Sequence, residues 1–202
     1  MARERRSAEQ TREHVLGVAA DLFYWHGIRA TGIDTVARAA GVAPTTLYRL
    51  FADKDDLVAA YLERQAKGYR EWFTAAQARG GDDPRARITA VFDALAIQTR
   101  PEVCRGCPFQ LALAEIPDSA QAAHRHATQV KRWVRTRFRR MAKDLGAADP
   151  TVLGDQLALI MEGVYATVAA FGGTGPTATT GRLVDLLLSS TAPRRRAAPR
   201  QS

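Results

Sequence analysis

Apolar residues recur at helical spacing along nearly all of the 202 residues of the chain. Val15, Ala19, Leu22 and Phe23, for example, follow one another at intervals that place them on one face of a helix. Glycine, proline and capping residues mark the points where the predicted helices begin and end. The pattern predicts helices over about residues 8–26, 32–40, 44–51, 54–78, 84–99, 108–116, 118–145, 150–171 and 177–190.

The pattern therefore predicts an all-α fold of about nine helices in two parts, a small N-terminal part and a larger C-terminal part. The first part, residues 9–69, is small and contains two short helices over about residues 32–51 that have the layout of a helix-turn-helix. Residues 70–190 form a larger and more apolar part. The arginine-rich residues 191–202 are expected to be a disordered basic tail.

Composition excludes several classes of protein. The chain is 46% hydrophobic, which is enough for a sizeable core, and its two cysteines are too few for a disulfide scaffold. No run of 18 apolar residues occurs and the N-terminal residues lead into an amphipathic segment, so we expect a cytoplasmic protein with no membrane partner. The net charge of +8 suggests an acidic partner such as nucleic acid.

Gly41 is the residue on which the helix-turn-helix interpretation depends. A steep crossing of two short helices needs a turn residue that tolerates left-handed backbone geometry, and glycine does so without strain. Ala37, four positions earlier, is small enough for the helices to approach closely. An ordinary helical hairpin is the alternative interpretation. Apolar residues spaced to form the core of this unit are Val36, Ala40, Val42, Leu47 and Leu50.

The second short helix presents residues with the chemistry of DNA recognition. Thr45, Thr46, Tyr48 and Arg49 combine short polar groups with a long cation, which suits base edges and phosphates.

From about residue 9 to residue 65, the sequence resembles the N-terminal domain of the TetR family of bacterial transcriptional regulators. The resemblance implies that residues 9–69 are a DNA-binding domain, that the helix from Pro44 enters the major groove, and that the protein binds a two-fold operator as a homodimer. The matching segments are Val15–Phe23, Gly27, Thr31, Ile33, Val36–Val42, Thr46–Phe51 and Lys54–Leu57.

Individual DNA contacts follow from this resemblance. It implies base contacts from Thr45, Thr46 and Arg49, on the helix that Pro44 begins, and phosphate contacts from Tyr48, Thr31 and Lys54. Lys54 also stands at a helix N-terminus, where a cation is disfavoured unless a group such as a phosphate compensates it. The alternative for Lys54 is a solvated surface lysine, and the alternative for Tyr48 is an aromatic residue that packs in the core. Ala43 departs from the serine common at this position and can neither cap the helix nor contact a phosphate.

The larger part resembles the effector-binding and dimerisation domain of the same family, notably over Cys104–Phe109 and Leu111–Asp118. The resemblance implies a cavity among the fifth to eighth helices that binds a small, largely hydrophobic molecule. A filled core is the alternative. The residues predicted to line the cavity are Phe92, Leu95, Cys107, Phe109, Leu113, Val130, Trp133, Val134, Met161 and Tyr165.

The last two helices are predicted to form the dimer interface, because a terminal helix as apolar as residues 177–190 must be covered. Burial within one chain is the alternative. Small residues that would allow close approach are Gly163, Ala166 and Ala170. The predicted interface residues are Leu157, Ile160, Val164, Val168, Leu183, Leu186 and Leu187.

Cys104 and Cys107 have the spacing of a thiol oxidoreductase, but no strand pattern surrounds them, so we expect no enzyme. His124 and His126 point in opposite directions on a helix and cannot both join the cysteines, so we expect no metal site and no cofactor. A thiol sensor remains open, because Cys107 stands near a predicted helix start and Arg105 adds positive charge. Two buried cysteines with no sensing role are the alternative.

The predicted function is a ligand-responsive transcriptional repressor that a small effector releases from a palindromic operator. The alternatives are a repressor that senses electrophiles through Cys107 and a DNA-binding factor with no effector. Net charge contributes little to this prediction, because residues 1–54 hold eight Lys+Arg against six Asp+Glu. Most of the basicity lies in residues 119–143, with eight Lys+Arg and no acidic residue, and a solvated arginine face is its simplest explanation.

Overall fold

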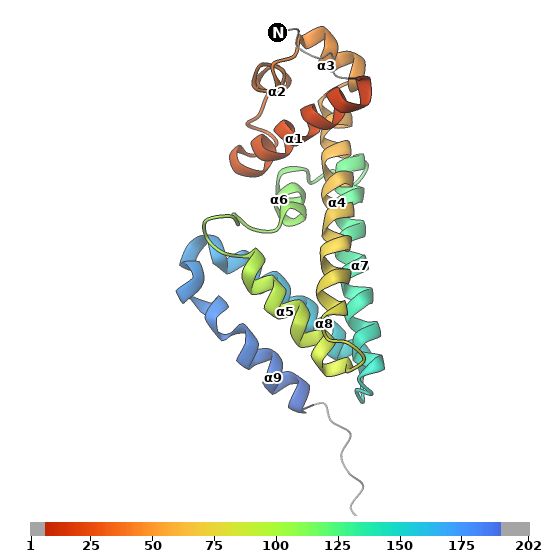
Figure 1. The fold of residues 1–202 in the computed structure, drawn as a ribbon, viewed down its shortest axis with the longest axis vertical. Helices are drawn as coiled ribbons and strands as arrows, with labels where there is room; N and C mark the ends of the chain where they lie inside the picture. The colour runs from red at the N-terminus through yellow and green to blue at the C-terminus, as the bar shows by residue number, and fades with distance from the viewer. Residues whose placement is uncertain (1–6, 191–202) are drawn as a thin grey trace, which may run out of the picture. The chain divides into compact units, whose positions relative to one another are not determined.

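The computed structural model describes residues 7–190, and over this range the regular elements are all helical, as predicted. The residues of the predicted tail, 191–202, lie outside the described range. The elements, labelled in Figure 1, are α1 (Ala8–His26), α2 (Ile33–Ala40), α3 (Pro44–Leu50), α4 (Lys54–Ala78), α5 (Pro84–Gln98), α6 (Pro108–Glu115), α7 (Ala122–Asp144), α8 (Pro150–Phe171), two short 3-10 turns, η1 (Gly172–Thr174) and η2 (Pro176–Thr179), and α9 (Thr180–Ser190).

Side-chain caps fix the starts of several helices. The Ser7 hydroxyl and the Gln10 side chain form a reciprocal capping box at α1. Asp83 caps α5 through the N–H of Arg85, and Asp149 caps α8. The last helix begins three residues later than predicted, because Pro176–Thr179 forms a 3-10 turn first.

The chain folds into two compact units, and neither is a continuous stretch of sequence. The first combines residues 7–71 with Arg105–Lys131, so α6 and the start of α7 belong to the same unit as α1 to α3 and most of α4. Its core contains Phe23 against Tyr61, with ring centroids 5.5 Å apart, and Tyr69 against Phe109 at 5.6 Å. The first unit thus includes a segment that the linear division at residue 69 assigns to the second part.

The second unit combines Trp72–Cys104 with residues 132–190. Its centre is an aromatic cluster in which Phe73 makes edge contacts with Trp133 and Phe138, both at 5.3 Å, and Phe92 stacks on Phe138 at 5.6 Å. Within this unit α9 packs against both α5 and α8 (Figure 1).

A glycine and an ion pair join α7 to α8. A Cβ on Gly154 would lie 2.5 Å from Cγ and 2.6 Å from Cα of Arg139, so this crossing requires glycine. The next residue, Asp155, accepts two hydrogen bonds from each of Arg135 and Arg139, at 2.7–2.8 Å. The hydrogen bonds from Arg135, and then those from Arg139, hold the pKa of Asp155 well below its usual value.

One helix of the described chain, within Pro150–Thr174, is long and apolar enough to cross a membrane by length and composition alone. The sequence has no uninterrupted run of 18 apolar residues, so this helix meets the criterion through its mean hydropathy. The criterion by itself is weak evidence for a membrane-spanning helix. A core helix of a globular protein meets the same criterion. In α8, Leu153, Leu157 and Met161 are buried in the second unit, and Asp155 is paired with two arginines.

Candidate functional site

The turn between α2 and α3 has the geometry that the sequence predicts. Gly41 adopts the left-handed conformation, with φ 64° and ψ 33°. Its N–H donates to the Arg38 carbonyl at 3.1 Å, and the N–H of Val42 donates to the Ala37 carbonyl at 3.0 Å. These two bonds satisfy carbonyls at the end of α2 and direct the chain into α3.

Buried apolar side chains hold α2 and α3 in place. Val36, Ala37, Ala40 and Leu47 are all buried, and Val36 and Leu47 have no exposed surface. At the end of α2 the Ala40 carbonyl lies 2.9 Å from Nε2 of His14, which belongs to α1. The position of α3 is therefore fixed by packing and by contacts with α1.

The exposed face of α3 carries the residues that are predicted to contact DNA. Pro44, Thr45, Tyr48 and Arg49 are exposed, and Thr46 is half-buried. Tyr48 is 51% exposed, so its ring lies outside the core. Ala43 precedes Pro44 and makes no side-chain cap, as expected from its methyl group.

Thr31 requires a correction. It is only 3% exposed, and its hydroxyl donates to the Gly27 carbonyl at 2.8 Å. A hydroxyl engaged in this way beneath the surface is not placed to contact a phosphate. Thr31 instead stabilises the loop that leads into α2, and we remove it from the candidate interface.

Lys54 lies at the start of α4, and its ammonium donates to the Arg29 carbonyl at 3.3 Å. The N–H of Arg29 in turn donates to the Glu115 carboxylate at 2.7 Å. Glu115 belongs to α6, so a residue distant in sequence holds the loop between α1 and α2. Sequence reasoning missed this contact because no local pattern relates residues 29 and 115.

The segment before α6 is tied to the end of α1. The Tyr24 hydroxyl donates to the Gly106 carbonyl at 2.9 Å and accepts the N–H of Arg105 at 2.7 Å. The Arg105 guanidinium also donates to the Tyr24 carbonyl at 2.7 Å. Behind this network Tyr61 is 2% exposed, and burial raises the pKa of its phenol above the ordinary value.

Cys104 and Cys107 are both buried and neither is in a disulfide. Cys107 is the N-cap residue of α6, and its sulfur lies 3.1 Å from Nζ of Lys131. This lysine contact could not be read from the sequence, where the two residues are 24 positions apart. Over residues 7–190, no group of three or more His, Cys, Asp and Glu side chains could hold a metal ion.

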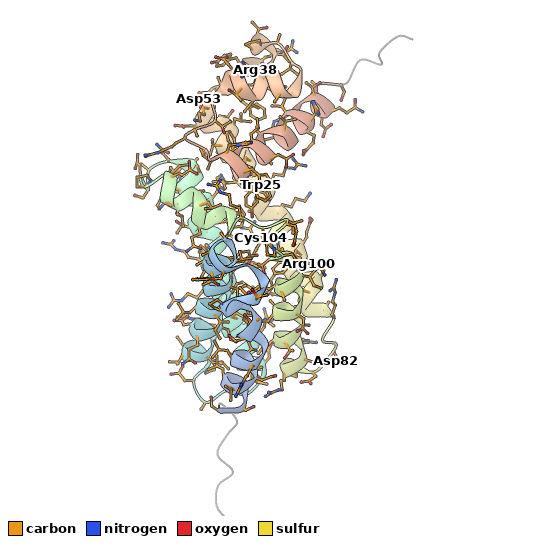
Figure 2. All side chains as sticks on the ribbon, turned by 90° about the vertical axis from the view of Figure 1, so that its left-hand side faces the viewer. Trp25, Arg38, Asp53, Asp82, Arg100 and Cys104 are labelled. Atoms are coloured by element: carbon orange, nitrogen blue, oxygen red, sulfur yellow. The ribbon has the colours of Figure 1, made fainter. Side chains whose placement is uncertain are left out.

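The second unit contains a cavity of about 260 Å³ among α5, α8, the 3-10 turns and α9. Only Phe92 and Leu95 of the ten predicted pocket residues line it. Polar lining residues that the sequence did not suggest are Thr89, Asp93, Thr99, Arg100, Thr177 and Thr180. Figure 2 labels Arg100, just beyond the end of α5.

The other eight predicted pocket residues lie elsewhere. Four belong to the first unit and four belong to the second, and none of the eight lines this cavity. Most pack in the cores, because aromatic and aliphatic residues at helical spacing fill a core as readily as they line a pocket. They are Cys107, Phe109, Leu113 and Val130 in the first unit, and Trp133, Val134, Met161 and Tyr165 in the second.

The residues of the predicted dimer interface divide between the core and the surface of the second unit. Leu157, Val164 and Val168 are buried in their own unit and face the core. Ile160 and Leu187 are half-buried, whereas Leu183 and Leu186 are 48% and 60% exposed. The exposed apolar residues of α8 that the prediction missed are Val152, Leu159 and Phe171, and the small residues Gly163, Ala166 and Ala170 are exposed with them.

Comparison with known proteins places this arrangement among bacterial regulators. A family model described as "Bacterial regulatory proteins, tetR family" matches residues 15–61. The crystal structure of SCO4454, a TetR-family transcriptional regulator from Streptomyces coelicolor, is 31% identical, covers 91% of this chain and 96% of that one, and superposes with a TM-score of 0.86. Two transcriptional regulators of the helix-turn-helix type are also similar. AcrR of Shigella flexneri is 36% identical over 85 residues, which are 42% of this chain and 40% of AcrR. YjdC of Escherichia coli K12 is 24% identical over 180 residues, which are 88% of this chain and 93% of YjdC.

Proposed function

The chain belongs to the TetR family of transcriptional regulators, which bind DNA and are not enzymes, and from this premise we propose that it is a repressor released by a small molecule. It binds a palindromic operator as a homodimer in the cytoplasm, with α3 of each subunit in the major groove. A ligand in the second unit changes the orientation of α4, which contributes residues to both units. The change in α4 alters the distance between the α3 helices of the two subunits. Ligand and operator then oppose each other through a coupling of about 1–3 kcal/mol.

The outer face of α3 carries this proposal. Thr45, Tyr48 and Arg49 are exposed, and within the described residues no hydrogen bond or ion pair ties their side chains to the rest of the chain. These side chains project from a helix whose opposite face is buried, and they suit the base edges and phosphates of the major groove. Lys54, with three ammonium donors, keeps donors for a phosphate beside its bond to Arg29.

Operator binding tests the assignment. The DNA upstream of the gene is titrated with wild type, Arg49→Ala and Lys54→Ala in gel-shift assays, each against a scrambled duplex. Arg49→Ala should lose about 1–3 kcal/mol of specific affinity and part of its sequence preference. Lys54→Ala should weaken binding to both duplexes alike. Equal loss of discrimination in both variants would contradict these roles.

We place the effector in the 260 Å³ cavity, whose wall combines apolar side chains with threonines, Asp93 and Arg100. A mainly apolar lining with a few polar groups suits a small, largely hydrophobic molecule. Compounds that release the operator are screened first. Ala96→Phe, which narrows the cavity from α5, should then abolish release by the active compound, while Ala114→Phe on α6, away from the cavity, should not. An equal response in both variants would exclude this cavity, and insensitivity to every compound would favour a factor with no effector.

Thiol sensing through Cys107 is a second candidate, and the Lys131 contact supports it. A positive charge 3.1 Å from the sulfur is a feature of reactive cysteines, although Cys107 is only 2% exposed. The purified protein is treated with hydrogen peroxide, and operator affinity is measured for wild type, Cys107→Ser and Cys104→Ser. Loss of the response in Cys107→Ser alone supports the candidate. An unchanged response in Cys107→Ser would refute it.

A further inference from the structure

Arginines on α5 and α7 surround a second cavity, of about 230 Å³, in the second unit. Its lining is mostly charged or amide-bearing, in contrast to the apolar cavity among α5, α8 and α9. Arg87 is eight residues before Leu95 on α5, or about 12 Å along the helix. Figure 2 labels Asp82 and Arg100 near the opposite ends of α5, and the charged cavity belongs to the Asp82 end. The lining residues are Gln77, Arg87, Arg137, Arg140, Met141 and Asp144.

Arg137 is the central residue of this cavity. Its guanidinium lies over the Trp133 ring, with Cζ 5.7 Å from the centroid, and Nη2 donates to Oε1 of Gln77 at 2.6 Å. The neighbouring Nε is buried and has no acceptor among the described residues. Buried guanidinium donors are almost always paired, because an unsatisfied charged donor is costly. Arg137 therefore has a donor that no acceptor within residues 7–190 satisfies.

The surrounding charges favour an anion as that acceptor. Arg87 is held in place by bonds from Nε to the Gly81 carbonyl and from Nη2 to Asp82 at 3.3 Å. Arg140 is exposed and makes no ion pair within residues 7–190. Asp144 is the only carboxylate among the lining residues, and Asp82 pairs with Arg87, so three guanidinium groups have two carboxylates nearby and the cluster keeps an excess positive charge.

Two other arginines of α7 lie outside this cavity and contact α8. Arg135 and Arg139 both form ion pairs with Asp155 on α8. The arginine-rich helix is therefore more than a uniform solvated face, because one part of it is paired and another part lines a cavity with excess positive charge.

We propose that this cavity is a binding site for a small anion that carries a phosphate or carboxylate group. Planar guanidinium edges bind both groups through paired N–H donors, which the free donors of Arg137 and Arg140 supply. The volume is below the range of about 300–1,000 Å³ typical of drug-sized ligands, which suits a small metabolite better than a nucleotide. The proposal is independent of operator binding and of the effector cavity.

Calorimetry on the full chain tests the proposal, with inorganic phosphate and succinate as probes and chloride used to hold ionic strength constant. We expect saturable binding of at least one probe at one site per chain. Arg140→Gln and Arg137→Lys should each weaken it at least tenfold. Arg137→Lys retains the charge but removes the guanidinium edge. Arg132→Gln, an exposed arginine of α7 outside the cavity, should change affinity less than twofold.

Several results would overturn the site. Failure of both probes to saturate would be one. Equal weakening by Arg132→Gln and Arg140→Gln would be another, because it would indicate general electrostatic attraction. Displacement of phosphate by a random DNA duplex, without any binding of succinate, would make the cavity part of a nucleic-acid surface instead. If thermal melting shows that Arg137→Lys is poorly folded, the exposed Arg140→Gln carries the test alone.

Discussion

The α2–α3 pair and the α8–α9 pair expose surfaces of opposite chemistry. On α3 the exposed Thr45, Tyr48 and Arg49 are polar or cationic, and the opposite face of the helix is buried. On α8 and α9 the exposed side chains include large apolar ones, with Leu159 at 72% and Leu186 at 60% exposure. A polar face without internal partners suits a hydrated polyanion such as DNA, whereas an exposed apolar face suits a protein partner. The two pairs therefore have different expected partners.

The largest effect should come from placing charge on the apolar face. Leu159→Glu combined with Leu186→Glu should weaken self-association about 100-fold or more, because like charges that face each other in an interface cost several kcal/mol. Sedimentation equilibrium measures the change. Ile97→Glu is the matched control, since Ile97 is 54% exposed on α5. A double variant that stays as dimeric as wild type would show that another surface joins the subunits.

The buried side of α8 should respond differently. Leu157 has no exposed surface, so Leu157→Ala should lower the free energy of unfolding by about 2–5 kcal/mol. Leu183→Ala, at a position 48% exposed, should lower it by less than about 0.5 kcal/mol. Urea denaturation in the Leu159→Glu/Leu186→Glu background removes the contribution of self-association. Similar losses in both variants would contradict the observed orientation of α8.

A smaller effect is expected at the helix-turn-helix. Gly41 has φ 64° but open space around it, so Gly41→Ala should cost about 1–2 kcal/mol through backbone strain alone. Gly68 lies within α4, also in open space, and Gly68→Ala should stabilise the protein by about 0.5–1 kcal/mol through helix propensity. Urea denaturation of both variants gives the sign of each change. Stabilisation by Gly41→Ala would mean that the turn does not need left-handed geometry.

The smallest effect should come from the ion pairs between α7 and α8. The two arginines lower the pKa of Asp155 in the folded state, so the pairs stabilise the fold above the unfolded pKa of about 3.9. This contribution is lost as pH falls below that value towards the folded pKa. The difference in Tm between wild type and Asp155→Asn should be constant from about pH 5 to pH 7 and should shrink below about pH 4. A difference that is independent of pH would show that the pairs do not contribute through ionisation.

The helix-turn-helix could be predicted because its determinants are local. The left-handed turn at Gly41, the proline at the start of α3 and the spacing of Val36, Ala37 and Leu47 are all fixed within a few residues of one another. Once these residues are buried, the face of α3 that carries Arg49 has to point outwards. Thr31 was misplaced because its burial depends on the loop around Gly27, not on helical periodicity.

On α8, by contrast, apolar or small residues occupy almost every position, so periodicity could not separate the core face from the exposed face. Burial of Leu157 and exposure of Leu159 depend on where α5, α7 and α9 pack. The contacts of Glu115 with the α1–α2 loop, of Lys131 with Cys107 and of Arg137 with its cavity also join residues far apart in the chain. The helices and the left-handed turn at Gly41 follow from the amino-acid sequence, since capping, backbone conformation and spacing are local. Which side chains meet and which stay exposed follows from the tertiary fold, because burial depends on the neighbours that the fold supplies.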